Sequence, residues 1–361
     1  MSHTPGGPPA PRVSVVIPAF NASGTLGETL ASVQAQTFQD FEVIVVDDGS
    51  SDATGEVAAG FAAHDPRFRC VRRDNGGVAA ARNAALELAR ASLVAPLDAD
   101  DLWHPEKLER QLLCLAAAEP RTVLVYSWSA DIDEASHVVA RRLDLDLFEG
   151  DVYAALVLMN FIGNASVPLI RREALLKLGG WDSTLRARGA QGCEDWQVYL
   201  RLAELGPFAL ARGFLVGYRQ SGTSMSRRVG EMTRSYELVL AEARQRHPEL
   251  PSSLFRWSRA AYDLYRFETL RASQEPLASL VPLLSGLLAD PSWLARRSTR
   301  HKLKRWLRSA FDPSTPKPGG LVGPAEAFAT ASPDPTYQVS EGRWSDARRA
   351  FVASLGITRR A

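Results

Sequence analysis

Residues 92–101 have the sequence Ser-Leu-Val-Ala-Pro-Leu-Asp-Ala-Asp-Asp, in which an apolar run ends in three carboxylates. The run from Leu93 to Leu97 predicts a buried strand, and a helical pattern follows from about Pro105. Polar side chains at the carboxyl end of a strand lie where open α/β sheets bind ligands. Mg²⁺ and Mn²⁺ prefer oxygen ligands and commonly bridge one or two carboxylates to phosphates. The stretch therefore predicts a site for a metal-bound diphosphate in an α/β fold.

The chain before this stretch alternates strand and helix in the same way. Apolar periodicity predicts strands over 13–17, 41–46 and 68–71, which are followed by helices over 26–33, 52–63 and 78–90. Strands that alternate with helices form mostly parallel sheets with right-handed crossovers. The sequence thus predicts an α/β fold with a Rossmann-like, mostly parallel central sheet flanked by helices.

The chain after this stretch is less regular. It predicts strands at 123–126 and 165–170 and helices at 152–159 and 194–205. Residues 229–311 lack strand signals and predict a helical C-terminal region. A Pro- and Gly-rich run that begins at 313 marks a linker and flexible tail over 312–361.

Composition and charge limit the kind of partner. The 361 residues carry a formal net charge of +1 at pH 7, which does not suggest nucleic acid binding. The three cysteines have neither a disulfide pattern nor a zinc spacing, as expected in a reducing compartment. The N-terminus lacks the apolar core of a signal peptide, and no apolar run reaches the roughly 18–20 residues that span a bilayer. We therefore expect a cytoplasmic location.

Six short motifs follow one another along the chain. They are Pro-Ala-Phe-Asn at 18–21, Asp-Asp-Gly-Ser at 47–50, Asn-Gly-Gly-Val-Ala-Ala-Ala-Arg-Asn at 75–83, Asp-Ala-Asp-Asp at 98–101, Gly-Gly-Trp-Asp at 179–182 and Glu-Asp-Trp at 194–196. In this order they resemble the motifs of family 2 glycosyltransferases, which have the GT-A fold. The resemblance implies a GT-A domain over 12–228 after a disordered 1–11. It divides that domain into a nucleotide-binding half over 12–101 and an acceptor-binding half over 102–228.

The resemblance also implies a donor site for a nucleotide-diphosphate sugar, with a UDP-sugar expected. The donor-binding residues it implies are Pro18, Ala19, Asn21, Asp48, Arg82 and Asp98. In this interpretation Asp48 accepts a hydrogen bond from the base, and Asp98 and Asp100 hold Mn²⁺ or Mg²⁺. The residues alone leave alternatives open, because Asp48 also suits an Asx-turn and Arg82 also suits a solvated helix surface.

Family 2 enzymes invert the anomeric centre, and the aspartate of their Glu-Asp motif is the general base, which corresponds to Asp195. The resemblance places Glu194, Asp182, Trp181 and Trp196 near the acceptor or the donor sugar. The alternative for Glu194 and Asp195 is a purely structural role at the positive end of a helix dipole. For both tryptophans the alternative is a place in the core.

Two features leave the full set of metal ligands undecided. Asp101 is expected to cap the helix near Pro105 rather than to bind metal. Many relatives carry a histidine after the Glu-Asp helix, but residues 218–226 are Tyr-Arg-Gln-Ser-Gly-Thr-Ser-Met-Ser. The metal then has carboxylate, phosphate and water ligands, with Arg219 or the hydroxyls as candidates to neutralise the diphosphate.

The segment Trp293 to Phe311 contains seven Lys and Arg residues and no acid. Its apolar residues fall at helical spacing, which is typical of a helix on a membrane surface. Packing of the same apolar face on the catalytic domain is the alternative. A peripheral contact with the inner membrane face would suit a saccharide or lipid-linked saccharide acceptor in cell-surface polysaccharide or glycoconjugate synthesis.

Two other functions are weighed against a glycosyltransferase. A catalytically inactive sugar-nucleotide-binding or scaffolding protein would not need the acidic pairs at 98–100 and 194–195, which are intact. A sugar-nucleotide pyrophosphorylase needs a basic phosphate loop after the first strand, and residues 18–24 contain no basic residue.

Overall fold

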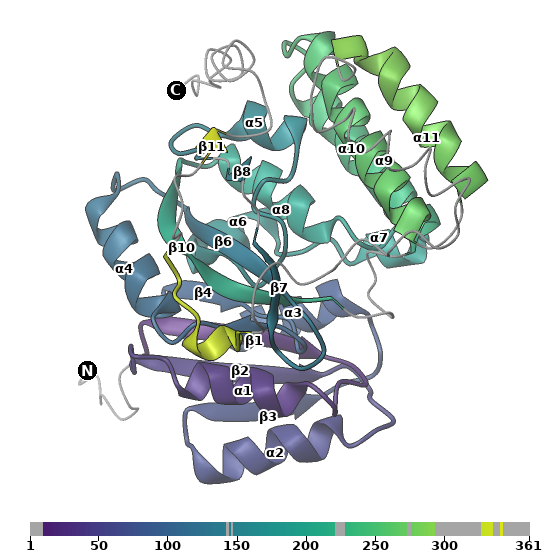
Figure 1. The fold of residues 1–361 in the computed structure, drawn as a ribbon. Helices are drawn as coiled ribbons and strands as arrows, with labels where there is room; N and C mark the ends of the chain where they lie inside the picture. The colour runs from purple at the N-terminus through teal and green to yellow at the C-terminus, as the bar shows by residue number, and fades with distance from the viewer. Residues whose placement is uncertain are drawn as a thin grey trace.

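The computed structural model describes residues 10–141, 144–145, 147–220, 228–272, 276–292, 326–334 and 340–341. Strands and helices alternate through the first part of the chain, and a separate group of helices follows (Figure 1).

One nine-stranded sheet organises the described part of the molecule, in the order β3-β2-β1-β4-β9-β6-β10-β5, with β7 paired to β6. Its strands are β1 (Val13–Ala19), β2 (Phe41–Asp47), β3 (Phe68–Arg72), β4 (Leu93–Pro96), β5 (Leu102–Trp103), β6 (Leu124–Ile132), β7 (Val138–Arg141), β9 (Leu169–Arg171) and β10 (Phe208–Arg219). The strands β1 to β4 are parallel, β9 is antiparallel to β4 and β6, and β10 is parallel to β6. A small second sheet pairs β8 (Asp144–Leu145) with β11 (Ser340–Glu341). The predicted mostly parallel sheet is confirmed.

Helices pack against this sheet and extend beyond it. They are α1 (Leu26–Gln34), α2 (Thr54–His64), α3 (Val78–Leu88), α4 (Lys107–Ala117), α5 (Tyr153–Leu158), α6 (Arg172–Leu178), α7 (Thr184–Ala187), α8 (Glu194–Ala203), α9 (Val229–Arg246), α10 (Ser252–Ala272), α11 (Pro276–Ala289) and the 3-10 turn η3 (Phe328–Thr330). Helix α3 packs on β1 and β2, α2 on β3, and α4 on β6 and β10.

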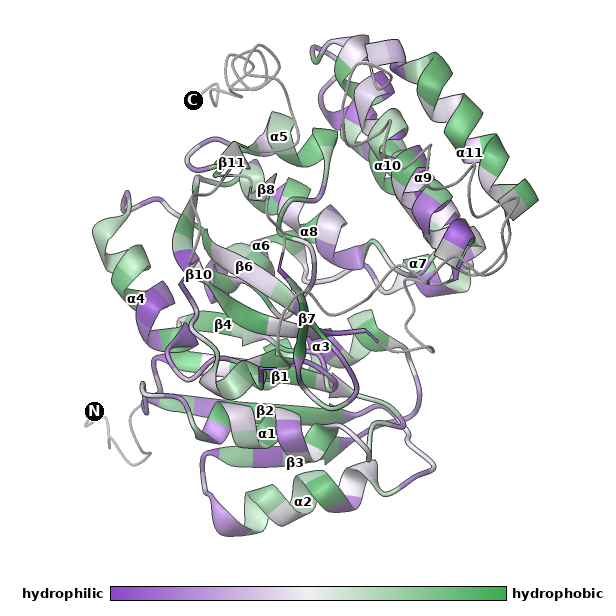
Figure 2. Cartoon of the chain, in the orientation of Figure 1, coloured by the Kyte–Doolittle hydropathy of each residue, from purple (hydrophilic) through white to green (hydrophobic). Residues whose placement is uncertain are grey.

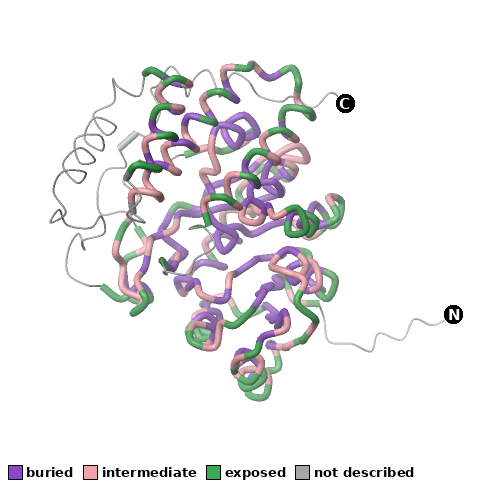
Figure 3. The backbone as a smooth tube through the Cα atoms, turned by 90° about the vertical axis from the view of Figure 1, so that its right-hand side faces the viewer, coloured by how far each residue is buried: buried purple, intermediate pink, exposed green. Residues whose placement is uncertain are grey.

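Strands β1 and β2 are buried along their whole length. Figure 3 shows buried backbone in the interior of the molecule and exposed segments on its outside. Their β-branched residues suit a pleated surface that is covered on both faces, as in parallel sheets. Inside this core, Ser14 donates a 2.7 Å hydrogen bond to Glu42 on the neighbouring strand. Since both faces of the sheet are covered in this region, polar side chains that bind a ligand are expected mainly at the ends of the strands.

Strand β10 is missing from the sequence prediction. It is 12 residues long, and Gly213, with a φ of 143°, lies within the first of two shifts in its pairing with β6. The glycine and the exposed Arg212 break the apolar pattern, so the local sequence gives a weak strand signal. The predicted strand at 165–170 is also shortened, because β9 begins at Leu169.

The predicted helical C-terminal region is present over 229–289 as helices α9, α10 and α11. Helix α10 packs against α9, α11 and α5, and α11 lies on the outside of the group (Figure 1). Within the ranges that the structure describes, each helix is too short or too polar to cross a membrane. The predicted basic helix at 293–311 lies outside the described residues.

Part of the predicted flexible tail packs against the sheet domain. Phe328 is buried, with its ring centroid 6.4 Å from that of His104, and Asp334 Oδ1 lies 2.7 Å from Arg110 Nη1. The prediction is therefore wrong for residues 326–334. Phe328 and Ala331 are both buried and supply the apolar contact, which the Pro- and Gly-rich composition of the tail as a whole does not reveal.

Candidate functional site

The neighbouring strands β2, β1 and β4 end at one edge of the sheet, and four predicted site residues follow them. Asn21 follows β1, Asp48 follows β2, and Asp98 and Asp100 follow β4. Pro18 and Ala19 are the last two residues of β1. The parallel pairing places these strand ends side by side, at the edge where open α/β sheets bind ligands.

The loops after β1 and β2 are tied together by Asn21. Its backbone has a φ of 49°, a left-handed conformation that asparagine tolerates better than most residues. Its N–H donates to Ser50 Oγ at 3.0 Å, and its Oδ1 accepts from Ser51 N at 2.9 Å. Asp48 N also donates to Ala19 O at 2.8 Å. The Pro-Ala-Phe-Asn and Asp-Asp-Gly-Ser motifs thus form one rigid wall.

The two aspartates at the end of β2, Asp47 in the strand and Asp48 just after it, have different partners. Asp47 accepts from Ser50 N at 2.8 Å and pairs with Arg72 Nη1 at 2.9 Å, which is a structural role. Asp48 accepts from the N–H groups of Gly76 and Gly77 at 3.0 and 2.7 Å. Arg73 Nε also lies 3.3 Å from Asp48 Oδ1. An ionised carboxylate offers about four acceptor sites, so with these three partners Asp48 keeps capacity for one further donor.

Arg82 on α3 joins the two acidic motifs of the site. Its side chain is 4% exposed, and Nη2 donates to Asp98 Oδ1 in a short hydrogen bond. Nη1 lies 3.9 Å from Asp195 Oδ1, and Cζ lies 6.0 Å from the centre of the Trp181 ring. The alternative of a solvated surface cation does not hold, since Arg82 is buried between two carboxylates.

Glu194 and Asp195 begin helix α8. Glu194 is buried and accepts from Gly192 N at 2.7 Å, and burial raises its pKa. The Asp195 side chain keeps 18% of its surface exposed. Burial raises the pKa of Asp195 to about 7, although the Arg82 guanidinium lowers it. A carboxylate that titrates near neutral pH and is open to a ligand suits proton transfer.

Asp100 and Asp101 are adjacent in the chain but have different surroundings. Burial and the charge of Asp98 raise the pKa of Asp100 to about 6. Asp101 is fully buried, accepting from Ser166 Oγ at 2.6 Å and from Arg219 N at 2.9 Å. The prediction that Asp101 caps a helix is wrong, because α4 begins at Lys107 and its N-cap position is Glu106. The Asp101 carboxylate instead holds the loop after β4 in place through these two hydrogen bonds.

Ser166 is a residue of this site that the sequence analysis missed. Its buried hydroxyl accepts from Asp98 N at 3.0 Å while it donates to Asp101. Trp103 Nε1 donates to Ser166 O at 2.9 Å. A serine between a short helix and a strand gives no sequence signal for this contact, which spans 65 residues along the chain.

Replacing Ser166 with alanine is expected to lower the free energy of unfolding by about 1–3 kcal/mol, since it removes one partner each from a buried amide and a buried carboxylate. Urea unfolding measures this change. Ser127→Ala is the matched control, because the buried Ser127 hydroxyl has no hydrogen-bond partner among the described residues. Equal losses in the two variants would contradict a supporting role for Ser166.

All the hydrogen-bond donors of the Arg219 guanidinium bind groups of the protein, so Arg219 is not free to neutralise a diphosphate. Its guanidinium is 2% exposed. It donates to the carbonyls of Asp100, Asp133 and Glu134, to the carboxylate of Glu28 and to the hydroxyl of Ser136. These bonds account for all five of its N–H groups. The role considered for Arg219 at the diphosphate is therefore wrong, and residues 221–226 with their hydroxyls lie outside the described residues.

The two tryptophans are core residues. Trp196 is 4% exposed, donates to Leu156 O at 2.8 Å and stacks on Tyr236 with centroids 5.3 Å apart. Its predicted place beside a sugar is not what the structure has, because its ring is covered. Trp181 is 3% exposed and is held through its backbone by Asn83.

Asp182 lies just before the short helix α7, whose N-cap position is Ser183. It accepts from Thr184 N at 2.9 Å and from Thr184 Oγ1 at 2.6 Å. Burial alone would raise the pKa of Asp182, but these hydrogen bonds outweigh it and lower the pKa.

The donor set at Asp98 and Asp100 suits a hard divalent cation. Asp98 is 28% exposed at its side chain, and its charge raises the pKa of Asp100, so a cation between them relieves repulsion. Among the described residues no group of three or more His, Cys, Asp and Glu side chains gathers around one point. Mg²⁺ and Mn²⁺ are commonly held by two carboxylates that leave the other positions to phosphate and water.

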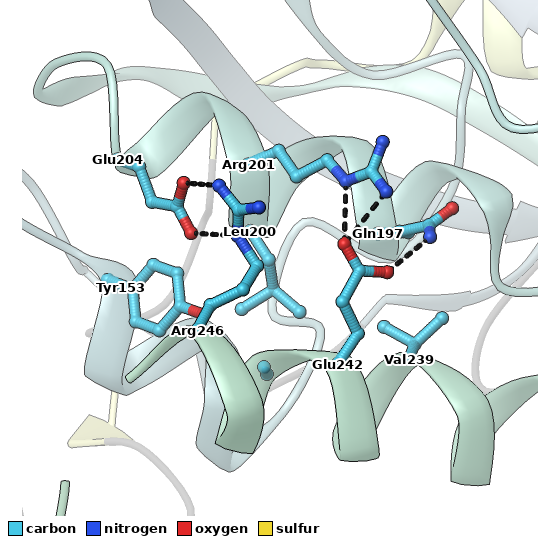
Figure 4. A pocket seen from close by; sticks show the side chains of 9 residues that line it. Tyr153, Gln197, Leu200, Arg201, Glu204, Val239, Glu242 and Arg246 are labelled. Atoms are coloured by element: carbon cyan, nitrogen blue, oxygen red, sulfur yellow. Dashed lines mark hydrogen bonds and ion pairs between the residues drawn. The ribbon is translucent and has the colours of Figure 1, made fainter. Parts of the chain in front are cut away.

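Helix α8 is fastened at its far end to α9. In the pocket of Figure 4, Glu242 bonds to Arg201 Nη2 at 2.8 Å and to Gln197 Nε2 at 2.6 Å, and Arg246 pairs with Glu204. None of the predicted site residues lines this pocket. The ion pairs hold the helix that carries Asp195 against the C-terminal helices.

Comparison with known proteins identifies the family. Residues 14–175 match the model of glycosyl transferase family 2. Chondroitin synthase of Escherichia coli is 28% identical over 201 residues, which is 55% of this chain and 27% of that protein. The putative teichuronic acid biosynthesis glycosyltransferase TuaG of Bacillus subtilis is 43% identical over 103 residues, 28% of this chain and 41% of that protein. The chain thus spans less than half the length of these two relatives.

Two solved structures share the fold. The mannosyltransferase PcManGT from Pyrobaculum calidifontis, in complex with GDP-Man and Mn²⁺, has a TM-score of 0.53 at 18% identity and covers 84% of this chain and 81% of its own. Residues 1–349 of S. aureus TarS, in complex with UDP-GlcNAc, have a TM-score of 0.50 at 15% identity and cover 79% and 92%. Identities this low show the fold alone. With the family match, they show that residues 14–175 form a glycosyl transferase family 2 domain and that the chain has the GT-A fold.

Proposed function

We propose that the protein is a metal-dependent, inverting glycosyltransferase that moves a sugar from a nucleotide-diphosphate sugar to an acceptor hydroxyl. The observation that carries this proposal is the Asp98–Arg82–Asp195 cluster at the carboxyl edge of the sheet. It pairs a carboxylate suited to the leaving-group side with one suited to proton removal.

Asp195 acts as the general base in this proposal. Inversion requires the acceptor hydroxyl to attack the anomeric carbon from the side opposite the departing diphosphate, and the hydroxyl loses its proton as it attacks. A carboxylate with a pKa of about 7 is largely ionised at slightly alkaline pH and is basic enough to take that proton. The open fraction of the Asp195 side chain is where the hydroxyl would approach.

Arg82 holds the two carboxylates in register. Its guanidinium has a fixed planar geometry and stays charged, so it fixes the orientation of Asp98 and keeps Asp195 from becoming more basic. Arg82 therefore contributes to donor binding by orienting Asp98. A bound nucleotide would compete with Asp98 for the guanidinium.

The donor nucleotide is proposed to lie along the wall formed by Pro18, Ala19, Asn21 and Asp48, with Asp48 accepting from a base N–H. A UDP-sugar is the preferred donor, because an Asp carboxylate complements the ring N–H of uracil. A Mn²⁺ or Mg²⁺ ion held by Asp98 and Asp100 would stabilise the negative charge on the leaving diphosphate.

The acceptor is proposed to be a saccharide or lipid-linked saccharide in polysaccharide or glycoconjugate synthesis. The names of the similar proteins, chondroitin synthase and a teichuronic acid glycosyltransferase, support a polymer product. The proposed acceptor-side groups are Glu194, which precedes Asp195 in the chain, and Asp182, which accepts from Gln197 Nε2 of the same helix at 3.5 Å. The membrane contact predicted through 293–311 falls outside the described residues and stays a prediction.

A donor screen tests the proposal. Nucleotide release from UDP-, GDP- and TDP-sugars is measured with Mn²⁺ or Mg²⁺, with a saccharide acceptor panel, and again after chelation by EDTA. We expect release from one donor class, loss with EDTA and recovery with Mn²⁺. Binding of nucleotide without release from any donor would favour the inactive sugar-nucleotide-binding protein instead.

A further inference from the structure

Helix α11 has an apolar face that is exposed. It exposes an apolar stripe, which consists of Leu277 (80% exposed), Val281 (66%), Leu284 (59%) and Leu288 (83%). Spacings of four, three and four residues place these side chains on one helix face. On the inner side, Ser279 is buried and Ser285 Oγ donates to Asp263 of α10 at 2.7 Å. A helix that meets water normally has the opposite arrangement.

No charged residue relieves the apolar stripe. Residues 276–289 contain no Lys, Arg, Asp or Glu. Figure 2 shows α11 in the colours of apolar residues along the outer side of the C-terminal helices. Its inner side is taken by α10, so the outer side has no partner among the described residues. A face of this kind indicates a surface that contacts an apolar medium.

We propose that the apolar stripe of α11 docks on the surface of an anionic lipid bilayer. The chain that follows α11 carries seven cations and no acid over 293–311. Membrane-surface binding strengthens with buried apolar area and with attraction of cations to anionic lipids. The apolar stripe supplies the first contribution, and the cations next to it in the chain supply the second.

A second copy of the chain is a poorer occupant. A helix of 14 residues is about 21 Å long and about 10 Å wide, so the stripe offers roughly 200 Å². A stable interface between proteins buries about 800 Å² on each partner. A bilayer has no such minimum, because side chains insert into it individually.

Flotation of the full chain with lipid vesicles tests the proposal and requires no substrate. Vesicles of phosphatidylcholine alone are compared with vesicles that also contain phosphatidylglycerol. The variant Leu284→Gln/Leu288→Gln removes half of the stripe. The control Leu113→Gln/Leu176→Gln changes two leucines that are 65% and 45% exposed on α4 and α6. We expect the wild type and the control to float with anionic vesicles, and the stripe variant to partition at least tenfold less.

Four results would overturn the proposal. They are no flotation of the wild type, equal flotation of the stripe variant, a wild-type dimer in ultracentrifugation that the stripe variant dissociates, and a lower melting temperature of the stripe variant without lipid. The last result would mean that the chain itself covers the stripe. Because none of these measurements involves sugar transfer, failure here leaves the proposed enzymatic function untouched.

Discussion

Replacing Asp195 with asparagine is expected to lower the rate of sugar transfer by about 10²- to 10⁴-fold, the usual contribution of a general base. The amide has nearly the same shape but cannot take the acceptor proton. Donor affinity is expected to stay unchanged, since Asp98 on the donor side is bound by Nη2 of Arg82, whereas Asp195 faces Nη1. Single-turnover transfer and calorimetric binding of UDP measure the two quantities.

Glu173→Gln is the matched control for this variant. Glu173 is also an acid in the first turn of a helix, α6, but it is exposed and apart from the site. If Asp195 served only the helix dipole, both variants would lose a few tenths of a kcal/mol in stability and neither would lose rate. A fully active Asp195→Asn variant would rule out the proposed base.

The pH dependence of the wild type follows from the same residue. Because the base must be ionised, kcat/KM is expected to fall as the pH drops below the Asp195 pKa of about 7 and to level off above it. A cation at Asp98 and Asp100 moves this limb to lower pH, so profiles at several Mn²⁺ concentrations separate the two effects.

Replacing Arg82 with methionine is expected to cost both stability and rate. Breaking a fully buried ion pair costs about 3–5 kcal/mol. Asp98 and Asp195 keep 28% and 18% exposure, so we expect a smaller loss, roughly 2–3 kcal/mol in the free energy of unfolding. Without the guanidinium, the pKa of Asp195 rises further, and the limb in kcat/KM moves to higher pH. Urea unfolding and a pH–rate profile measure these changes.

Two further variants check this result. Arg90→Met removes an arginine that is 49% exposed and pairs with buried Glu42 away from the site, so its pH profile is expected to match the wild type. Arg82→Lys keeps the charge and should restore part of the activity, although lysine lacks the planar fork. An unshifted pH limb in Arg82→Met would contradict the proposed coupling to Asp195.

Much of the architecture is predictable from short stretches of sequence. The apolar runs that form β1, β2 and β4 are flanked clearly enough by turn residues to be recognised from the sequence pattern alone. Strand β10 escapes this approach because Gly213 and Arg212 interrupt it, and only its pairing with β6 and β5 makes it a strand. Local preference is weak there, and tertiary pairing overrides it.

The same division holds for the site. The sequence by itself predicted the resemblance to family 2 from the order of its motifs, the strand ends at which the acids lie from its apolar runs, and the candidate base Asp195. Only the tertiary structure decided which of these groups are open to a ligand. The side chains of Arg219 and Trp196 are buried and hydrogen-bonded within the protein, and Ser166 supports the Asp98 loop. The physical reason is that hydrogen bonding and burial depend on neighbours that are distant in the chain. Sequence spacing determines which face of a helix or strand a side chain occupies, but not what lies opposite it.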